Sequence, residues 1–552
     1  MFKISRTFAQ VFLAVGLSGS FALAQSADWK VKKTAWTEAD EKEYSEFVSK
    51  IGQAVEKREC NSFQSCLNHP NNPYRGSDGS QLKVFADCAK LSYVMRGYFA
   101  WKKGLPFSVV SDIELRDVEG NSGDPRYSRF GNVVMARTDF TPRKSSTGEI
   151  KFANAITSIN KTIVNEVYSA NFRINFEGID NSKLFADFYP VELTREAIAP
   201  GTNIYDPNGH VAIVYKVTDD GRIYFIDAHP DNSLTSGLFG TKFVRSNPGQ
   251  GAGFKNFRPY RLEGAQFDTT SGSYYGGTIV PSKDSELPLH SLMQLFGTNL
   301  AMNDWKKGVF QIDGTTYPYY DYVRMKMSKG NLKLSPASEI KSLAEDLCQT
   351  VQDRIEAVDS ALKSGVQKKA HPAQLPVNIY GTAGEWEEYS TPSRDARLKT
   401  TFKELRDLGE NLLNLYNARD PRVVYNGTDI KGDMINSYKA VVNACKIQYT
   451  KSNGEKMALS LEQVRARIFA LSFDPYHCAE LRWGASSAAE LATCGDDATK
   501  KQWYQGEQWL RNQIERRYDV RMDFSLGDLT GPKPGAGVAT PPDTDIIGFL
   551  SK

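Results

Sequence analysis

One cysteine of the chain stands where proteins usually build a nucleophile. In the stretch Asp87-Cys88-Ala89-Lys90-Leu91, Asp87 is a good helix N-cap, because its carboxylate can accept hydrogen bonds from the free amides of the first turn. Cys88 then takes the first helical position, where a thiol has a lowered pKa and is partly thiolate at neutral pH. The stretch therefore predicts a nucleophilic thiol at Cys88. The alternative is a small buried residue at the start of a core helix.

A second group of reactive side chains lies in a predicted β-hairpin. Residues 211–217 are mostly β-branched or aromatic and predict a strand, and residues 222–226 predict the returning strand. Asp220 and Gly221 are typical of a two-residue turn between them. Because side chains alternate between the two faces of a strand, this register decides which polar residues share a face.

The predicted hairpin places His210, Asp227 and His229 on one face, where an imidazole and a carboxylate of neighbouring strands can meet. A cysteine nucleophile needs a base, and the base needs a group that orients it. We therefore predict Cys88 as nucleophile, His210 as base and Asp227 as the orienting group, with His229 as the alternative to Asp227. In the opposing interpretation, His210 is a polar strand-end residue and Asp227 a turn former.

Attack on an amide also requires hydrogen-bond donors for the oxyanion. The backbone amide of Cys88, at the helix N-terminus, is one natural donor. Gln81 or Tyr74, shortly upstream, is expected to supply a second.

The helix that would carry Cys88 is well marked. An apolar stripe runs along one face, formed by Leu91, Val94, Met95, Tyr98 and Phe99. Gly104 can take the left-handed conformation that ends a helix, and Leu105-Pro106 stops its continuation.

The number of cysteines separates Cys88 from the rest. There are seven, an odd number, and cysteines of an exported chain tend to pair. The expected pairs are Cys60 with Cys66, Cys348 with Cys445, and Cys478 with Cys494. Cys88 is then left as a free thiol, which strengthens its assignment as a nucleophile.

No metal or cofactor is expected. The six histidines and seven cysteines show neither CxxC nor HExxH spacing, which argues against a zinc site. His477 and Cys478 stand side by side, but adjacent side chains point in different directions and Cys478 is expected to form a disulfide. We therefore interpret this pair as structural.

The order of these residues resembles that of the papain-like superfamily: a helix-opening Cys, a His at the start of a strand, and a polar residue on the next strand. NlpC-type cell-wall peptidases, one branch, have similar motifs. The matching segments are Pro73-Tyr74-Arg75-Gly76, Asp87-Cys88-Ala89, Gly104-Leu105-Pro106, Pro200-Gly201-Thr202 and Gly209-His210-Val211-Ala212-Ile213. The chain departs from the NlpC pattern at Ala89-Lys90, where that branch has Ser-Gly, and at Thr202, where it has Asp.

Bacterial transglutaminase-like peptidases resemble the chain in another way. They share the Cys helix with an Arg inside it, which is Arg96 here, and the His-to-Asp spacing that fits His210 and Asp227. The resemblance covers about residues 70 to 230 and does not extend to the helical half. It implies an α+β fold in which the Cys helix packs on an antiparallel sheet.

The chain as a whole predicts an exported protein of several parts. Lys3 and Arg6 precede an apolar run that ends in Ala22-Leu23-Ala24, as in a signal peptide cleaved near Ala24. The predicted divisions are a signal peptide (1–24), an N-terminal helical extension (25–59), a papain-like catalytic domain (60–262), a linker and inter-domain segment (263–330), a mainly α-helical domain (331–528) and a disordered tail (529–552). No later stretch has eighteen consecutive apolar residues, so no transmembrane anchor is predicted. A net charge of +3 does not indicate binding to nucleic acid.

Three functions follow from this reading. The favoured one is a periplasmic or secreted thiol hydrolase that cuts a peptide or amide bond through a Cys88 thioester, most naturally in peptidoglycan stem peptides. The second is a transglutaminase-like protease or acyltransferase that acts on proteins. The third is a non-catalytic envelope binding or scaffold protein with a papain-like shell. The polar stretch Glu385 to Asp395 suggests that the helical half forms one wall of a substrate cleft.

Overall fold

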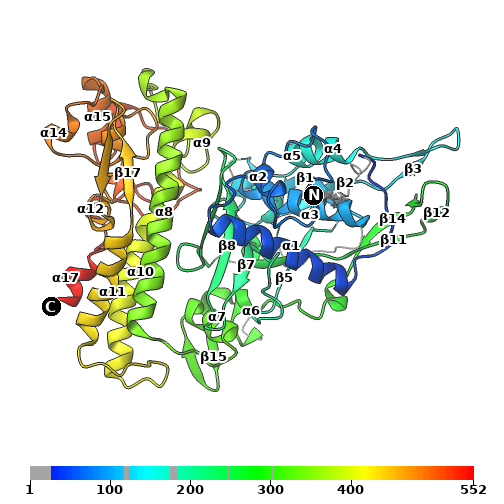
Figure 1. The fold of residues 1–552 in the computed structure, drawn as a ribbon, viewed down its shortest axis with the longest axis horizontal. Helices are drawn as coiled ribbons and strands as arrows, with labels where there is room; N and C mark the ends of the chain where they lie inside the picture. Colours follow the sequence, from blue (N-terminus) through cyan, green and yellow to red (C-terminus); the bar gives the residue numbers. More distant parts are fainter. Residues whose placement is uncertain (1–26, 117–122, 175–184, 246–247, 301–303) are drawn as a thin grey trace, which may run out of the picture.

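The structure is a computed structural model that describes residues 27–116, 123–174, 185–245, 248–300 and 304–552. The predicted signal peptide lies outside the described residues. Figure 1 shows two parts side by side: one contains a β-sheet and the N-terminal helices, and the other is dominated by long helices. No helix of the described ranges is both long and apolar enough to cross a membrane.

A six-stranded antiparallel sheet forms the centre of the first part. Its order is β5 (Phe188–Pro190), β10 (Gly253–Phe257), β6 (Asn203–Asp206), β7 (His210–Val217), β8 (Ile223–Ala228) and β9 (Leu234–Leu238). The chain is thus a mixed α and β protein, as the sequence predicts. Most residues of β6, β7 and β8 are buried, so both faces of the sheet are covered.

Alternating residues of β7 enter two different cores. Val211, Ile213 and Tyr215 pack with helices α1 (Glu38–Glu56) and α3 (Cys88–Lys103). Ala212 and Val214 belong to a second core on the opposite face, which also holds residues of α7 (Tyr319–Met327). This alternation follows from the two-residue period of a strand.

Helix α3 has the predicted start and end. The Asp87 carboxylate accepts hydrogen bonds from the amides of Ala89 (3.1 Å) and Lys90 (3.0 Å). At the other end, Gly104 has φ +66° and closes the helix in the left-handed conformation. Cys88 is therefore the first residue of a helix, as predicted.

Smaller elements surround the sheet. They are α2 (Phe63–Leu67), the pair β1 (Ser108–Leu115) and β2 (Asn132–Asp139), β3 (Arg143–Lys144) with β4 (Ile150–Lys151), α4 (Ala155–Thr157), α5 (Val164–Glu166), β11 (Tyr260–Glu263) with β14 (Thr278–Pro281), β12 (Gln266–Asp268) with β13 (Ser273–Tyr275), α6 (Met293–Phe296), and β15 (Phe310–Ile312) with β16 (Thr315–Tyr317). Several of these lie between 263 and 330, so the predicted linker and inter-domain segment contains hairpins and short helices.

The second part is built on three long helices, α8 (Pro336–Ser364), α10 (Pro392–Asn417) and α11 (Ile430–Ala444), which share one core. Figure 1 shows α8 running beside the sheet part. There the Asp346 carboxylate accepts hydrogen bonds from the Leu238 amide and the Lys242 ammonium, each at 2.7 Å. The remaining elements are α9 (Glu385–Tyr389), β17 (Ile447–Thr450) with β18 (Lys456–Leu459), α12 (Leu461–Ala466), α13 (Ala479–Arg482), α14 (Ala488–Leu491), α15 (Ala498–Gly506), α16 (Gln508–Arg511) and α17 (Ile546–Leu550).

The C-terminal segment is not a disordered tail, and that prediction is wrong. Its last residues form α17, which packs on α10 and α11. Ile546 and Leu550 are almost fully buried in the helical core. The prediction was based on the Pro- and Gly-rich composition and did not consider the short apolar sequence at the end. Burial of these apolar residues offsets the entropy lost on ordering the segment.

The disulfide prediction is confirmed. The structure contains Cys60–Cys66, Cys348–Cys445 and Cys478–Cys494, and Cys88 is a free thiol. The second bridge joins α8 to the end of α11, as expected for two helices tied together.

Candidate functional site

The β7–β8 hairpin differs from the predicted one in two compensating ways. Val217 pairs with Ile223, and the Thr218 amide donates to the Arg222 carbonyl, so the turn has three residues instead of two. The pairing then shifts by one more residue between Val214 and Lys216. Two shifts of one residue restore the side-chain alternation. The predicted shared face is therefore retained although the turn prediction is wrong.

His210, Asp227 and His229 lie together at the end of this hairpin. His210 Nε2 is 2.6 Å from one carboxylate oxygen of Asp227, and the hydroxyl of Thr235 on β9 donates to the other. His229 Nε2 lies 2.9 Å from the Thr235 hydroxyl oxygen and 3.8 Å from Asp227. Asp227 is thus hydrogen-bonded directly to His210, whereas His229 is linked to Asp227 mainly through the Thr235 hydroxyl.

The Asp227 carboxylate fixes the protonation of His210. Because an ionised carboxylate can only accept hydrogen bonds, Nε2 of His210 must carry the proton and Nδ1 keeps its lone pair. Burial and the nearby Arg397 lower the pKa of His210 to about 4, despite the opposing effect of Asp227. Burial alone would raise the pKa of Asp227, but His229, His210 and Arg397 lower it far below the usual range. At neutral pH the pair is a neutral imidazole held by a carboxylate.

The Cys88 thiol is half-buried and its sulfur lies 3.8 Å from the Gly209 carbonyl oxygen, directly before His210. Burial and the neighbouring Asp87 carboxylate raise the pKa of this thiol to about 12. The expected lowering of the pKa is therefore wrong for this conformation. The thiol is desolvated, and the nearby Lys90 offsets the effect of Asp87 only in part.

Cys88 and His210 approach the strand from different sides. Helix α3 packs on the face that carries Val211, whereas the His210 ring contacts Phe243, whose centroid is 6.2 Å away in the opposite core. Among the hydrogen bonds of the described residues, none joins the Cys88 sulfur to the imidazole. The structure thus forms the His–Asp pair and leaves the thiol bound to the backbone beside it.

A cavity of about 460 Å³ nevertheless connects the two groups. It lies where β7 begins and β8 ends, so that it is lined by Cys88 from one face of the sheet and by His210 and His229 from the other. The helical part lines it with residues 379–382, 386–388, 390–394, Arg397, Arg516 and Tyr518. The stretch expected to form a cleft wall therefore does line this cavity.

The two proposed oxyanion residues do not lie at the cavity. The Tyr74 ring contacts Phe47, Tyr98 and Phe99, near the end of α3, about 15 Å along the helix from Cys88 at 1.5 Å per residue. Gln81 is exposed, and its carbonyl accepts a hydrogen bond from Asn160. The backbone amide of Cys88 remains a donor, since it makes no hydrogen bond within the described part of the chain.

Arg96, which carries part of the resemblance to the transglutaminase-like branch, is occupied elsewhere. Its guanidinium donates to both carboxylate oxygens of Glu41 on α1 and lies 3.4 Å from the Trp36 ring centroid. These contacts tie α3 to α1 and the N-terminal segment. Arg96 therefore has a structural role in this fold.

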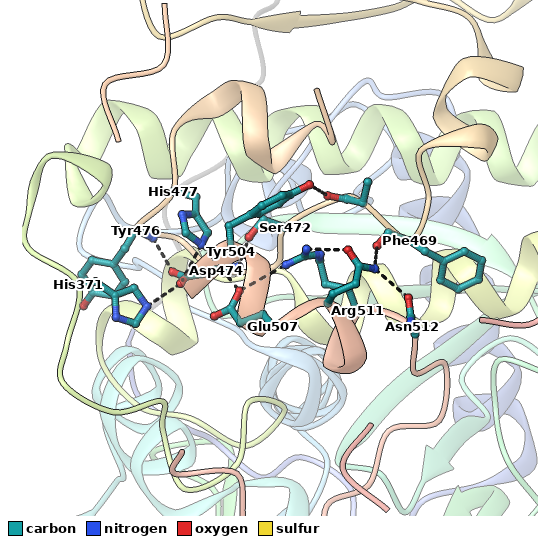
Figure 2. A network of polar contacts seen from close by, with 12 residues as sticks. His371, Phe469, Ser472, Asp474, Tyr476, His477, Tyr504, Glu507, Arg511 and Asn512 are labelled. Carbon is teal, nitrogen blue, oxygen red and sulfur yellow. Dashed lines mark hydrogen bonds and ion pairs between the residues drawn. The ribbon is translucent and has the colours of Figure 1, made fainter. Parts of the chain in front are cut away.

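A second buried polar network lies in the helical part, and Figure 2 shows its residues His371, Asp474, His477 and Glu507. His371 Nε2 is 2.7 Å from Asp474, His477 Nδ1 is 2.9 Å from Asp496, and Glu507 lies 3.8 Å from His477. Burial alone would lower the pKa of His477, but Asp474, Asp496 and Glu507 raise it to about 9. This explains the His477-Cys478 pair as structural: the imidazolium balances buried carboxylates and Cys478 forms a disulfide.

Two arginines that line the cavity were missed from sequence: Arg397 and Arg516. Arg394 lies within the stretch expected to form a cleft wall, but it was not singled out. One signal for Arg394 was available, because it stands four residues before Leu398 and so extends the apolar stripe of α10, where a cation is unusual. Thr235, which orients Asp227, gave no signal, because nothing in the sequence distinguishes it from other strand threonines.

Comparison of the chain with protein-family models, with curated proteins and with solved structures found no match. The assignment of a function therefore depends on the geometry of this cavity.

Proposed function

We propose that the chain is a thiol hydrolase that attacks a peptide or amide carbonyl with Cys88. The observation that carries this proposal is that a free thiol at a helix N-terminus and a carboxylate-oriented neutral imidazole line one cavity. His210 acts as the base through Nδ1, and Asp227 keeps it in that tautomer.

The raised pKa of Cys88 favours proton removal during attack over a preformed ion pair. The thiol turns from the Gly209 carbonyl into the cavity and gives its proton to His210 Nδ1 as the sulfur bonds to the substrate carbonyl carbon. The oxyanion that forms is accepted by the Cys88 backbone amide. The leaving amine takes the proton from His210, and water then hydrolyses the thioester, with His210 again acting as base.

The proposed substrate class rests on the sequence resemblance and the disulfides. The resemblance of the sequence motifs to NlpC-type peptidases supports a peptide bond in peptidoglycan stem peptides as the target. Three disulfides fit an exported protein in an oxidising compartment such as the periplasm. A transglutaminase-like reaction on proteins would use the same Cys88, His210 and Asp227, with an amine in place of water.

One observation favours a second candidate function, a non-catalytic binding module. The Cys88 sulfur is held by a backbone carbonyl and not by His210, and its pKa is raised. A protein that only binds envelope peptides in this cavity needs no more than the cavity itself.

The decisive experiment incubates the protein with peptidoglycan fragments and, separately, with protein substrates, and identifies products by mass spectrometry. We expect products that disappear in Cys88→Ala and in His210→Gln. His229→Gln is the matched control, because His229 lines the same cavity but is hydrogen-bonded to Thr235. Loss of activity in His229→Gln with retention in His210→Gln would reassign the base. Absence of any Cys88-dependent product would refute the hydrolase function and favour the non-catalytic binding module.

A further inference from the structure

Three arginines of the helical part converge on the cavity that holds Cys88. Two of them already have partners. Arg394 forms an ion pair with Asp231 at 3.2 Å. Arg516 pairs with Asp206 and also donates to the Lys242 carbonyl at 2.8 Å. Arg516 Nη1 has no hydrogen-bond partner among the described residues. The third arginine, Arg397, differs because its whole guanidinium is without one.

Arg397 is 9% exposed and lines the cavity wall. In the described part of the chain its guanidinium makes neither a hydrogen bond nor an ion pair within 4 Å. An arginine remains charged in proteins and offers five N–H donors. Leaving such a group buried without an acceptor is costly, so natural structures almost always supply one. An anion that enters the cavity would supply it.

The charges along the cavity indicate how such an anion would be oriented. The exposed part of the lining carries Glu387 and Glu388, while Arg397 and Arg516 are buried. The two buried charges of the lining are therefore positive and its two exposed charges are negative. The half-buried Asp87, Lys90, Asp124, Arg126 and Arg394 carry both signs. A ligand that carries a carboxylate at its inner end and a neutral or positive group at its outer end matches this arrangement.

We propose that Arg397 binds a free carboxylate of the substrate, in the cavity that also holds Cys88 and His210. This inference rests on the proposed hydrolase function and narrows its substrates to peptides or amides with a carboxylate close to the scissile bond. The planar fork of the guanidinium receives both carboxylate oxygens, which fixes the orientation of the substrate as well as its charge. Arg394 and Arg516 keep their own carboxylate partners and contribute to the positive field.

The test compares matched alkylating probes at Cys88, the only free thiol of the described residues. Iodoacetate and N-iodoacetylglycine carry a carboxylate, and iodoacetamide and N-iodoacetylglycinamide are their neutral counterparts. Each anionic-to-neutral rate ratio is divided by the same ratio for the urea-unfolded protein, which removes intrinsic reactivity. For at least one pair we expect a corrected ratio of about ten or more, as fits a charge-assisted bidentate contact.

In Arg397→Gln this ratio should fall to about one, whereas Arg397→Lys should keep an intermediate value, because it retains the charge without the fork. Arg126→Gln is the matched control: Arg126 lines the same cavity but is paired with Asp124 at 2.7 Å. A ratio near one in the wild type for both pairs, or a ratio that Arg397→Gln leaves unchanged, overturns the proposal.

Two further measurements keep the result unambiguous. If Arg397→Gln does not fold, wild-type alkylation by iodoacetamide is followed with sodium acetate or sodium chloride at equal ionic strength, and stronger protection by acetate is expected. Equal protection by both salts counts against the site. The hydrolase assay tests the proposed function separately. An Arg397-dependent alkylation ratio without Cys88-dependent products would refute the hydrolase function but support the carboxylate site. Cys88-dependent products without such a ratio would support the hydrolase function and refute the carboxylate site.

Discussion

Removing the charge next to the nucleophile should make Cys88 more reactive. Asp87 is the second cause, after burial, of the raised pKa of the Cys88 thiol. Asp87→Asn removes that charge while keeping the helix cap, because Asn caps helices about as well as Asp. The substitution therefore isolates the electrostatic contribution from the structural one.

The magnitude follows from the pKa of about 12. At pH 7.5 such a thiol is roughly 3,000-fold less ionised than a free cysteine of pKa about 8.5, while its thiolate is about 40-fold more nucleophilic. Wild-type Cys88 should thus react with iodoacetamide on the order of 100-fold more slowly than a free cysteine. A nearby unit charge, partly offset by Lys90, shifts a pKa by about one unit, so Asp87→Asn should react about threefold faster.

The assay is the rate of iodoacetamide labelling at Cys88 between pH 6 and 10, followed by peptide mapping. The wild-type rate should keep rising with pH throughout, since ionisation is far from complete. A plateau of the rate below about pH 8.5, or labelling as fast as that of a free cysteine, would refute the conclusion that burial raises the pKa of Cys88. It would instead support a thiolate that exists before substrate binds. A slower rate in Asp87→Asn would show that the carboxylate does not raise the pKa.

Three other outcomes can be checked. Asp227→Asn should change the free energy of unfolding little but reduce turnover by about 10²- to 10⁴-fold, because an amide can donate to Nε2 of His210 and reverse its tautomer. An undiminished kcat would contradict the role of Asp227. The pKa of His477 is raised from 6.5 to about 9, so its contribution is present below pH 6.5 and lost as the pH rises through 9, at most roughly 3 kcal/mol; urea midpoints at pH 6 and 9.5 should differ less in His477→Gln. The Cys348–Cys445 disulfide closes a loop of 97 residues, and replacing both cysteines by serine should cost about 4 kcal/mol in urea unfolding, whereas an unchanged midpoint would show that α8 and α11 are held by packing alone.

Local rules were sufficient for the elements that carry Cys88 and His210. The Asp87 cap, the Gly104 end and the Cys88 helix depend on interactions within one or two turns, and these are visible in the sequence. The hairpin shows how far such rules reach. Its turn length was wrong and a bulge was not foreseen, but the two errors cancelled, so His210 and Asp227 still share a face.

Long-range packing explains what the sequence did not reveal. No local pattern shows that α10 covers the end of β7 and places Arg397 beside His210, because the two segments are almost 190 positions apart. The same holds for Tyr74, whose aromatic contacts with α1 and α3 keep it far from the thiol. The pKa of Cys88 was misjudged for a similar reason, since the helix position was visible but the burial was not.

The division of the candidate site between the two faces of the sheet gives the helical part a direct chemical role. Cys88 belongs to the α3 face, but the environment of His210 is set from the other face, where burial, Arg397 and Arg516 lower its pKa. With that face open to solvent, the imidazole would return toward its ordinary pKa and be partly protonated at neutral pH, which removes a base. The helical part therefore keeps the base neutral as well as forming a wall of the cavity.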